Sequence, residues 1–145
     1  MRHDSRLSRM LHVLIHMDRH GGAVTSEAIA AMLNTNPVVI RRTMAGLRDH
    51  GYVRSEKGHG GGWSLARPLA GISLLDVYRA LGEPPVFAMG PTGDHPECLV
   101  EQAVNASVTA ALREAEAVFM ARLAAVTLAD IAADFDRRYA EVRGA

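Results

Sequence analysis

The chain has 145 residues, 48% of them apolar, and its 16 acidic side chains balance its 16 basic ones. This length accommodates one domain, or two small ones that share a core. No apolar run approaches the ~18 residues of a membrane-spanning helix, and no signal-peptide core is evident at the amino terminus. The single cysteine, Cys98, excludes an internal disulfide and is typical of a reducing compartment. We therefore expect a cytoplasmic protein.

The zero net charge is the sum of two oppositely charged halves. Residues 1–70 carry ten basic and five acidic side chains, whereas residues 71–145 carry six basic and eleven acidic ones. A basic first half favours an anionic partner such as nucleic acid, because clustered positive charge attracts a polyanion. Chance segregation of charge is the alternative interpretation.

The first predicted helix spans residues 5–20. Apolar side chains recur there at the three- and four-residue spacing of a single helix face. Ser5 is a suitable amino-terminal cap, and Gly21 with Gly22 ends the helix.

The opposite face of this helix carries His12, His16 and His20. Histidines four residues apart can bind one metal ion, but no acidic or cysteine ligand lies nearby in the sequence. We therefore expect a solvated polar face and no metal site. An enzyme built on the His12 and His16 pair would also need a third ligand and a general base, so we expect no enzymatic activity.

Two further helices joined by a tight turn follow. The segment TSEAIAAMLN, residues 25–34, predicts a short helix with Thr25 or Ser26 as its cap. A turn then precedes Pro37, which suits the first position of a helix, and Gly51 ends this third helix. A short helix, a turn and a longer helix with an outward basic face indicate a helix-turn-helix.

A hairpin with a glycine-rich tip comes next. Strand-like runs at residues 52–55 and 62–66 flank the segment EKGHGG, and a hairpin directly after a recognition helix is a wing. We expect Trp63 and Leu65 to anchor it on the core. We expect the glycines to let backbone N–H groups approach DNA phosphates, and so to serve reach rather than packing.

The second half is predicted to be helical. Residues 73–82 form a short helix capped by Ser73, and the connector over residues 83–98 contains four prolines and two glycines that exclude a regular helix. A long helix covers residues 99–126, and Thr127 caps a short final helix. The long helix is apolar on more than one side, which exceeds what half of this chain can cover, so we expect a second copy to pack against it.

We thus predict a mainly α fold with a small β-hairpin, a winged helix-turn-helix followed by a long dimerisation helix. Pro68 closes the first part. The predicted domains are a winged helix-turn-helix DNA-binding domain over residues 1–68, and a connector with a helical dimerisation and sensor region over residues 69–145.

The segment TSEAIAAMLNTNPVVIRRTMAGLRDHGYVRSEKGHGGGWSLARP, with ISLLDVYRALGE after it, resembles the Rrf-type (IscR/NsrR-like) family of bacterial transcriptional regulators. The resemblance covers most of the chain, and the glycine-rich wing ending in LAR is its most specific part. It implies a homodimer with crossed long helices that binds a partly palindromic operator. It also implies DNA contacts by residues of the reading helix and the wing tip: Asn36, Val38, Val39, Arg41, Arg42, Lys57, Gly58, His59 and Gly60.

One departure from the family concerns the cofactor. Members that bind an iron–sulfur cluster carry three cysteines near the start of the long helix, whereas this chain has Cys98 alone, with Val104 and Ala110 in the territory of the other two. Such clusters are held by several cysteines, occasionally with histidine, so we expect no cluster and no other cofactor. Cys98 is either a redox-sensing thiol or a vestigial one.

We therefore expect a sequence-specific DNA-binding transcriptional regulator, a repressor that acts as a homodimer. Its expected partners are double-stranded DNA and an oxidant or small-molecule signal that acts on the connector around Cys98. Arg41 and Arg42 would contact phosphates and guanine, and Lys57 would hold the DNA backbone. The alternative is a winged-helix module that binds protein without DNA, and a salt series on DNA binding discriminates the two.

Overall fold

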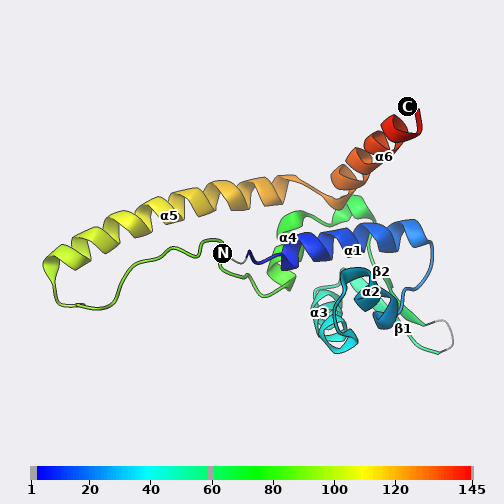
Figure 1. Cartoon of the computed structure of the whole chain (residues 1–145), viewed down its shortest axis with the longest axis horizontal. Helices are drawn as coiled ribbons and strands as arrows, with labels where there is room; N and C mark the ends of the chain where they lie inside the picture. The colour runs from blue at the N-terminus through cyan, green and yellow to red at the C-terminus, as the bar shows by residue number, and fades with distance from the viewer. Residues whose placement is uncertain (1–2, 59–60, 145) are drawn as a thin grey trace.

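The computed structural model describes residues 3–58 and 61–144, and it is mainly helical with one antiparallel hairpin (Figure 1). The elements, in chain order, are α1 (Arg6–His20), α2 (Ser26–Leu33), α3 (Pro37–Asp49), β1 (Val53–Glu56), β2 (Gly62–Leu65), the 3₁₀ turn η1 (Leu69–Gly71), α4 (Leu74–Ala80), α5 (Leu99–Ala125) and α6 (Leu128–Gly144). The predicted fold class is confirmed, and the two strands lie within one residue of their expected positions.

Helix α1 lies at the centre of the apolar core. It packs against α2, β2, α4 and α6, so that both halves of the sequence share one interior. Burial of a large aliphatic side chain contributes roughly 1.5–3 kcal/mol to folding. Seven such side chains from five parts of the chain are almost completely buried: Leu14, Ile29, Ile40, Met44, Leu47, Ile72 and Leu128.

The start of α1 differs from the expectation, because Asp4 and not Ser5 supplies the capping bond. Asp4 Oδ1 accepts a hydrogen bond from the backbone N–H of Arg6 at 3.1 Å, and the Arg6 guanidinium pairs with this carboxylate at 2.7 Å. The guanidinium bond and then the backbone bond lower the pKa of Asp4 to about 2. Ser5 has ψ of 10°, not the extended conformation that aims a capping side chain at the first turn, so its prediction as the cap was wrong.

The first residues of α4 and α6 lie side by side. Ser73 and Asp76 form a reciprocal capping box at α4, which confirms the predicted cap, and Thr127 and Asp130 make the equivalent pair of bonds at α6. The backbone segments before the two helices also bond to each other, with Leu74 N–H donating to Val126 O at 2.9 Å. This pairing joins the carboxyl end of α5 to the core.

The final helix is longer than predicted, since α6 runs for 17 residues. Its first turn is buried around Leu128 and Ala132, but its second half is mainly exposed. Asp134 bonds to Arg137 and to Arg138 one turn further along, and such pairs support a helix where few side chains are buried. The apolar spacing of Leu128, Ile131, Phe135 and Tyr139 indicated a shorter helix, and its last two members are exposed.

Helix α5 extends away from the remainder of the chain (Figure 1). It has 27 residues, and Leu123 near its carboxyl end is the only one of them that its own chain buries. Val100 is 71% exposed and Val118 is 73% exposed. The connector before α5 contains no helix or strand, as predicted. The apolar surface of α5 therefore lacks a cover within this chain.

Candidate nucleic-acid interface

The hairpin is attached to α2 through Trp63. The backbone of Trp63 exchanges hydrogen bonds of 2.8 and 2.9 Å with that of Val24. Its indole Nε1–H donates to Ser26 Oγ at 2.9 Å within the core. Leu65 is half-buried on the same strand, so the expected anchoring of the wing is confirmed. Val24 and Ser26 were not predicted as partners, because nothing in the local pattern shows which backbone a strand will meet.

The glycines of the hairpin have two different roles. A Cβ on Gly62 would lie 2.4 Å from Val24 O, and a Cβ on Gly61 would lie 2.4 Å from Glu56 O. These two glycines therefore allow close packing of the hairpin, and the expectation that the glycines serve reach rather than packing was wrong for them. Gly58 differs, because it has φ of 95° and open space around it. Its backbone is accessible at the wing tip.

Helix α3 begins as its sequence predicts. Pro37 occupies the first turn, and Asn36 Oδ1 accepts a hydrogen bond from the backbone N–H of Val38 at 2.7 Å. The side-chain oxygen of Asn36 thus caps α3, which leaves the two N–H groups of its side-chain amide as donors. Thr25 caps the preceding helix by accepting from the N–H of Ala28 at 3.1 Å. Both caps fix the direction in which α3 leaves the turn.

The outward face of α3 carries apolar and basic side chains. Val38 is 55% exposed and Val39 is 50% exposed, and Arg41 and Arg42 are also exposed. The buried stripe of Ile40, Met44 and Leu47 occupies the other side of this helix. A face of this composition matches the major groove of DNA, where guanidinium groups bind guanine or phosphate and aliphatic groups contact the thymine methyl.

An ion pair links α2 to this face. Glu27 Oε1 lies 2.6 Å from Arg41 Nη2, and both side chains are more than half exposed. Arg42 makes no ion pair with any residue of the described part of the chain. The contact between Glu27 and Arg41 was not predicted from the sequence. The two residues are fourteen positions apart in the sequence, and their contact depends on the angle between α2 and α3.

The hairpin of β1 and β2 lies on the same side of α1 as α2 and α3 (Figure 1). Lys57 and Gly58 are exposed there, while His59 and Gly60 fall outside the described residues. Gly61 N–H donates to Gly58 O at 3.0 Å and closes the turn. The structure thus brings the hairpin and α3 to one side of α1.

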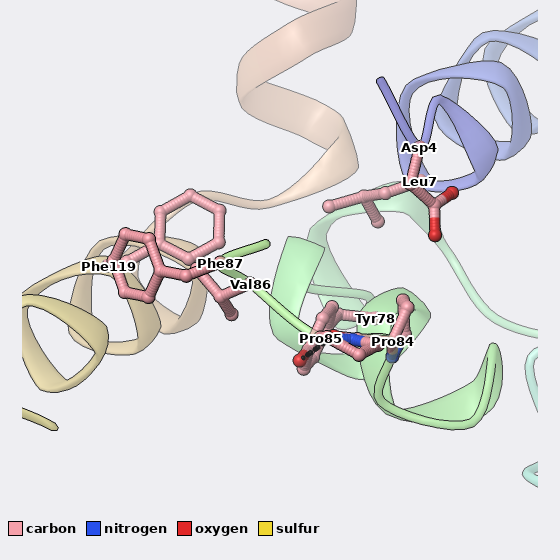
Figure 2. A pocket seen from close by; sticks show the side chains of 8 residues that line it. All are labelled: Asp4, Leu7, Tyr78, Pro84, Pro85, Val86, Phe87 and Phe119. Atoms are coloured by element: carbon pink, nitrogen blue, oxygen red, sulfur yellow. Dashed lines mark hydrogen bonds between the residues drawn. The ribbon is translucent and has the colours of Figure 1, made fainter. Parts of the chain in front are cut away.

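A cavity of about 420 Å³ lies away from this face, where the connector meets α1, α4 and α5. Figure 2 shows Phe87 of the connector and Phe119 of α5 on one wall, and Tyr78 with Pro84 on another. The Tyr78 hydroxyl donates to Pro84 O at 2.5 Å. Burial, followed by the nearby charges of Glu116 and Glu83, raises the pKa of Tyr78. This contact ties the start of the connector to α4.

The end of the connector is attached to the first turns of α5. Cys98 occupies the capping position of α5, is exposed, and makes no capping bond with its side chain. Three side chains of α5 bond back to the preceding backbone: Asn105 to Thr92, Glu101 to His95 and Gln102 to Pro96. Cys98 is therefore an accessible thiol between α5 and residues 92–96 of the connector, which the side chains of α5 hold by hydrogen bonds.

The comparisons with known proteins agree with this geometry. The sequence pattern of the Rrf2 family, described as iron-dependent transcriptional regulator, matches residues 3–134. The chain belongs to the Rrf2 family. It is 32% identical over 130 residues to YwnA of Bacillus subtilis, which is named as an HTH-type transcriptional regulator, and the match covers 88% of this chain and 95% of YwnA.

Two solved structures have the same fold along almost their whole length. A transcriptional regulator from Lactobacillus plantarum superposes with a TM-score of 0.75 at 26% identity, covering 97% of this chain and 95% of that one. CymR, the global cysteine regulator of B. subtilis, superposes with a TM-score of 0.62 at 26% identity, covering 92% and 98%. Both likenesses include the winged helix and the long helix of this Rrf2 chain.

This Rrf2 chain is thus a transcriptional regulator with a DNA-binding fold and not an enzyme. Rrf2 regulators bind DNA and are typically dimeric. Within residues 3–58 and 61–144, no helix has both the length and the apolarity that crossing a bilayer requires.

The residues near Cys98 offer few ligands for the iron–sulfur cluster that the family resemblance implies for some members. Such clusters are held by several cysteine thiolates, with histidine replacing some of them in certain cases, and this chain has one cysteine. In the part of the chain that the structure describes, no three His, Cys, Asp or Glu side chains gather as a metal site. The donor set is too small for a cluster in one chain.

Proposed function

We propose that this protein is a sequence-specific repressor that binds a partly palindromic operator as a homodimer. The observation that carries the proposal is the outward face of α3, which presents two valines and two arginines beside a wing that Trp63 attaches to the core. The basic first half of the chain supplies the matching long-range attraction to DNA. A module that binds only protein would have no need of the excess of basic residues in this half of the chain.

The proposed contacts follow from the accessible groups. Arg42 extends from α3 toward a phosphate or a guanine, and Arg41 does so together with Glu27. Val38 and Val39 contact thymine methyl groups, and Asn36 donates through its amide. Lys57, the backbone of Gly58 and, by the family resemblance, His59 and Gly60 hold the sugar–phosphate backbone beside the groove.

The proposed homodimer is supported by the uncovered apolar surface of α5. Two copies packed along α5 would present two reading helices to half-sites about one helical turn apart, near 34–36 Å. A two-fold symmetric protein then requires a partly palindromic operator, because each copy reads the same half-site in the opposite direction.

The first experiment tests the reading face. Operator fragments are selected from genomic DNA by the purified protein, and the dissociation constants of Arg41→Ala and Arg42→Ala are then measured on the selected site. A bidentate arginine–guanine pair is worth ~1–3 kcal/mol, so we expect a loss of about ten- to hundredfold for the arginine that reads a base. Arg143→Ala, at the far end of α6, is the matched control. Full affinity in both α3 variants would exclude α3 from the groove.

We further propose that the signal acts on the connector around Cys98, either as an oxidant or as a small molecule. The proposal is supported by the position of this thiol, which is exposed between residues 92–96 of the connector and the start of α5. Oxidant sensing predicts that peroxide releases DNA from the parent protein and not from Cys98→Ser, which keeps the fold and the dimer. Equal release from both proteins would show that the Cys98 thiol is not the sensor, and a small-molecule signal would then be the remaining alternative.

A further inference from the structure

The exposed face of α1 brings two imidazoles together. Nε2 of His12 and Nε2 of His16 lie 2.9 Å apart, and the two rings stand edge to face with 4.6 Å between their centroids. Both side chains are exposed. The spacing of four residues allows many arrangements of two side chains, and the structure shows the one in which the two Nε2 atoms lie next to each other.

We propose that His12 and His16 form a bidentate site for a divalent late transition metal ion, with Cu²⁺ and Ni²⁺ preferred to Zn²⁺. Metal–imidazole bonds are about 2.0–2.1 Å long, so two nitrogens 2.9 Å apart subtend an angle of about 90° at the ion. That angle belongs to square-planar and octahedral ions, whereas tetrahedral zinc would need a separation of about 3.3 Å. The general order of affinity also places Cu²⁺ first. The proposal replaces the expectation that this face is only solvated.

The surroundings of the pair leave room for an ion. His12 and His16 line one side of a groove of about 660 Å³ between α1 and α6. Arg19, the cationic residue of that groove, donates to both carboxylate oxygens of Asp136 at 2.9 and 3.0 Å, which neutralises its charge. Because no third ligating side chain gathers at this place in the described chain, the remaining coordination positions are open to water or to a small solute.

Metal binding at this site acts on the central helix of the fold. An ion held by His12 and His16 joins two successive turns of α1, the helix that packs against α2, β2, α4 and α6. A ligand that binds only the folded chain raises its stability in proportion to the logarithm of ligand concentration over Kd. We therefore expect the thermal midpoint to rise with Cu²⁺ or Ni²⁺. This inference does not depend on the proposed operator contacts.

The test is a titration of Cu²⁺, Ni²⁺ and Zn²⁺ into the full chain. His3→Ala protein serves as the background, so that the histidine near the amino terminus contributes no uptake. Calorimetry should give one site per chain with affinity in the order Cu²⁺, Ni²⁺, Zn²⁺, and the electron paramagnetic resonance spectrum of Cu²⁺ should show two imidazole nitrogens. Added to this background, His12→Ala or His16→Ala should lower the affinity about a hundredfold, because a chelate becomes a single ligand.

Two controls make the assignment specific. His20→Ala, one turn further along α1, and His50→Ala, just after the end of α3, should retain the affinity and the spectrum of the background. Circular dichroism establishes that each variant is folded, as expected for exposed side chains. The proposal is overturned if the His12→Ala, His16→Ala double variant binds as the background does, if His20→Ala abolishes binding, or if no ion binds and the pair is only a neutral hydrogen bond.

Discussion

At the scale of single residues, Glu27 determines how Arg41 is presented. The 2.6 Å ion pair holds the guanidinium beside the first turn of α2, and we expect the carboxylate to repel a phosphate that approaches there. Both side chains are largely exposed, so solvent screens the pair and its own contribution to stability is small. Its importance lies in orienting Arg41.

Replacing this carboxylate tests the idea. Glu27→Gln should raise affinity for random DNA, because a negative charge is lost beside the interface, and lower the ratio of specific to random affinity by a factor of about two to five, equivalent to ~0.5–1 kcal/mol. The ratio is measured at one fixed salt concentration. Asp49→Asn removes a charge at the other end of α3 and should leave the ratio unchanged. An unchanged ratio in Glu27→Gln as well would show that Arg41 is oriented without it.

Gly62 gives a second prediction at this scale. A methyl group there would meet Val24 O at 2.4 Å, and the φ of 151° is one that other residues rarely adopt. We expect Gly62→Ala to lower the free energy of unfolding by about 1–3 kcal/mol and to detach the wing from α2. Chemical denaturation measures the change. Gly22→Ala, with open space around it, is the control and should change stability by less than about 1 kcal/mol.

At the scale of secondary-structure elements, α5 is the part of the chain that most needs a partner. Val104 is 53% exposed on the apolar stripe, and Val100 and Val118 are exposed further still. A helix with such a surface is covered either by its own chain or by another one. Its own chain buries only Leu123.

A charge placed on the stripe should separate the dimer. We expect Val104→Glu to be monomeric in analytical ultracentrifugation and to bind the operator at least tenfold more weakly, since burying an unpaired carboxylate costs several kcal/mol. Helical content should be retained, because the side chain is exposed within one chain. Ala106→Glu, on the opposite side of α5, is the matched control. A dimeric Val104→Glu would place the interface elsewhere.

How far each element could be predicted depended on how local its signal was. Helix α1, the turn before Pro37 and the cap at Ser73 were predicted from adjacent residues, because helix periods, caps and turns are short-range features. The length of α6 was underestimated, since its second half depends on charged pairs and carries little apolar periodicity. The Glu27–Arg41 pair was missed because it joins separate elements.

At the scale of the whole molecule, the fold places the basic and apolar surfaces on different sides. Helix α3 and the wing lie on one side of α1, and α5 leaves from the other (Figure 1). In the proposed dimer, packing along α5 would leave both α3 helices accessible. Helix α4 contacts α1, α3 and α5, so in the proposed dimer we expect a shift of α5 relative to α4 to change the spacing of the two α3 helices.

Salt dependence measures the DNA surface as a whole. The logarithm of the binding constant should fall steeply with the logarithm of salt concentration, by about 0.9 for each phosphate contact. Lys57→Ala alters one contact in each copy, so a dimer should lose about 1.8 from this slope. Arg143→Ala should leave the slope unchanged. A parent protein without salt dependence would favour the protein-binding alternative.

The sequence alone determined the order of the elements, the winged helix-turn-helix, the absence of the three-cysteine motif and the resemblance to the family, because each of these depends on residues close together in the chain. Only the tertiary structure decided that Gly61 and Gly62 pack while Gly58 stays open, that Glu27 meets Arg41, and that the imidazoles of His12 and His16 converge. The reason is physical: backbone propensity acts over a few residues, whereas contacts and side-chain rotamers are set by the packing of distant elements.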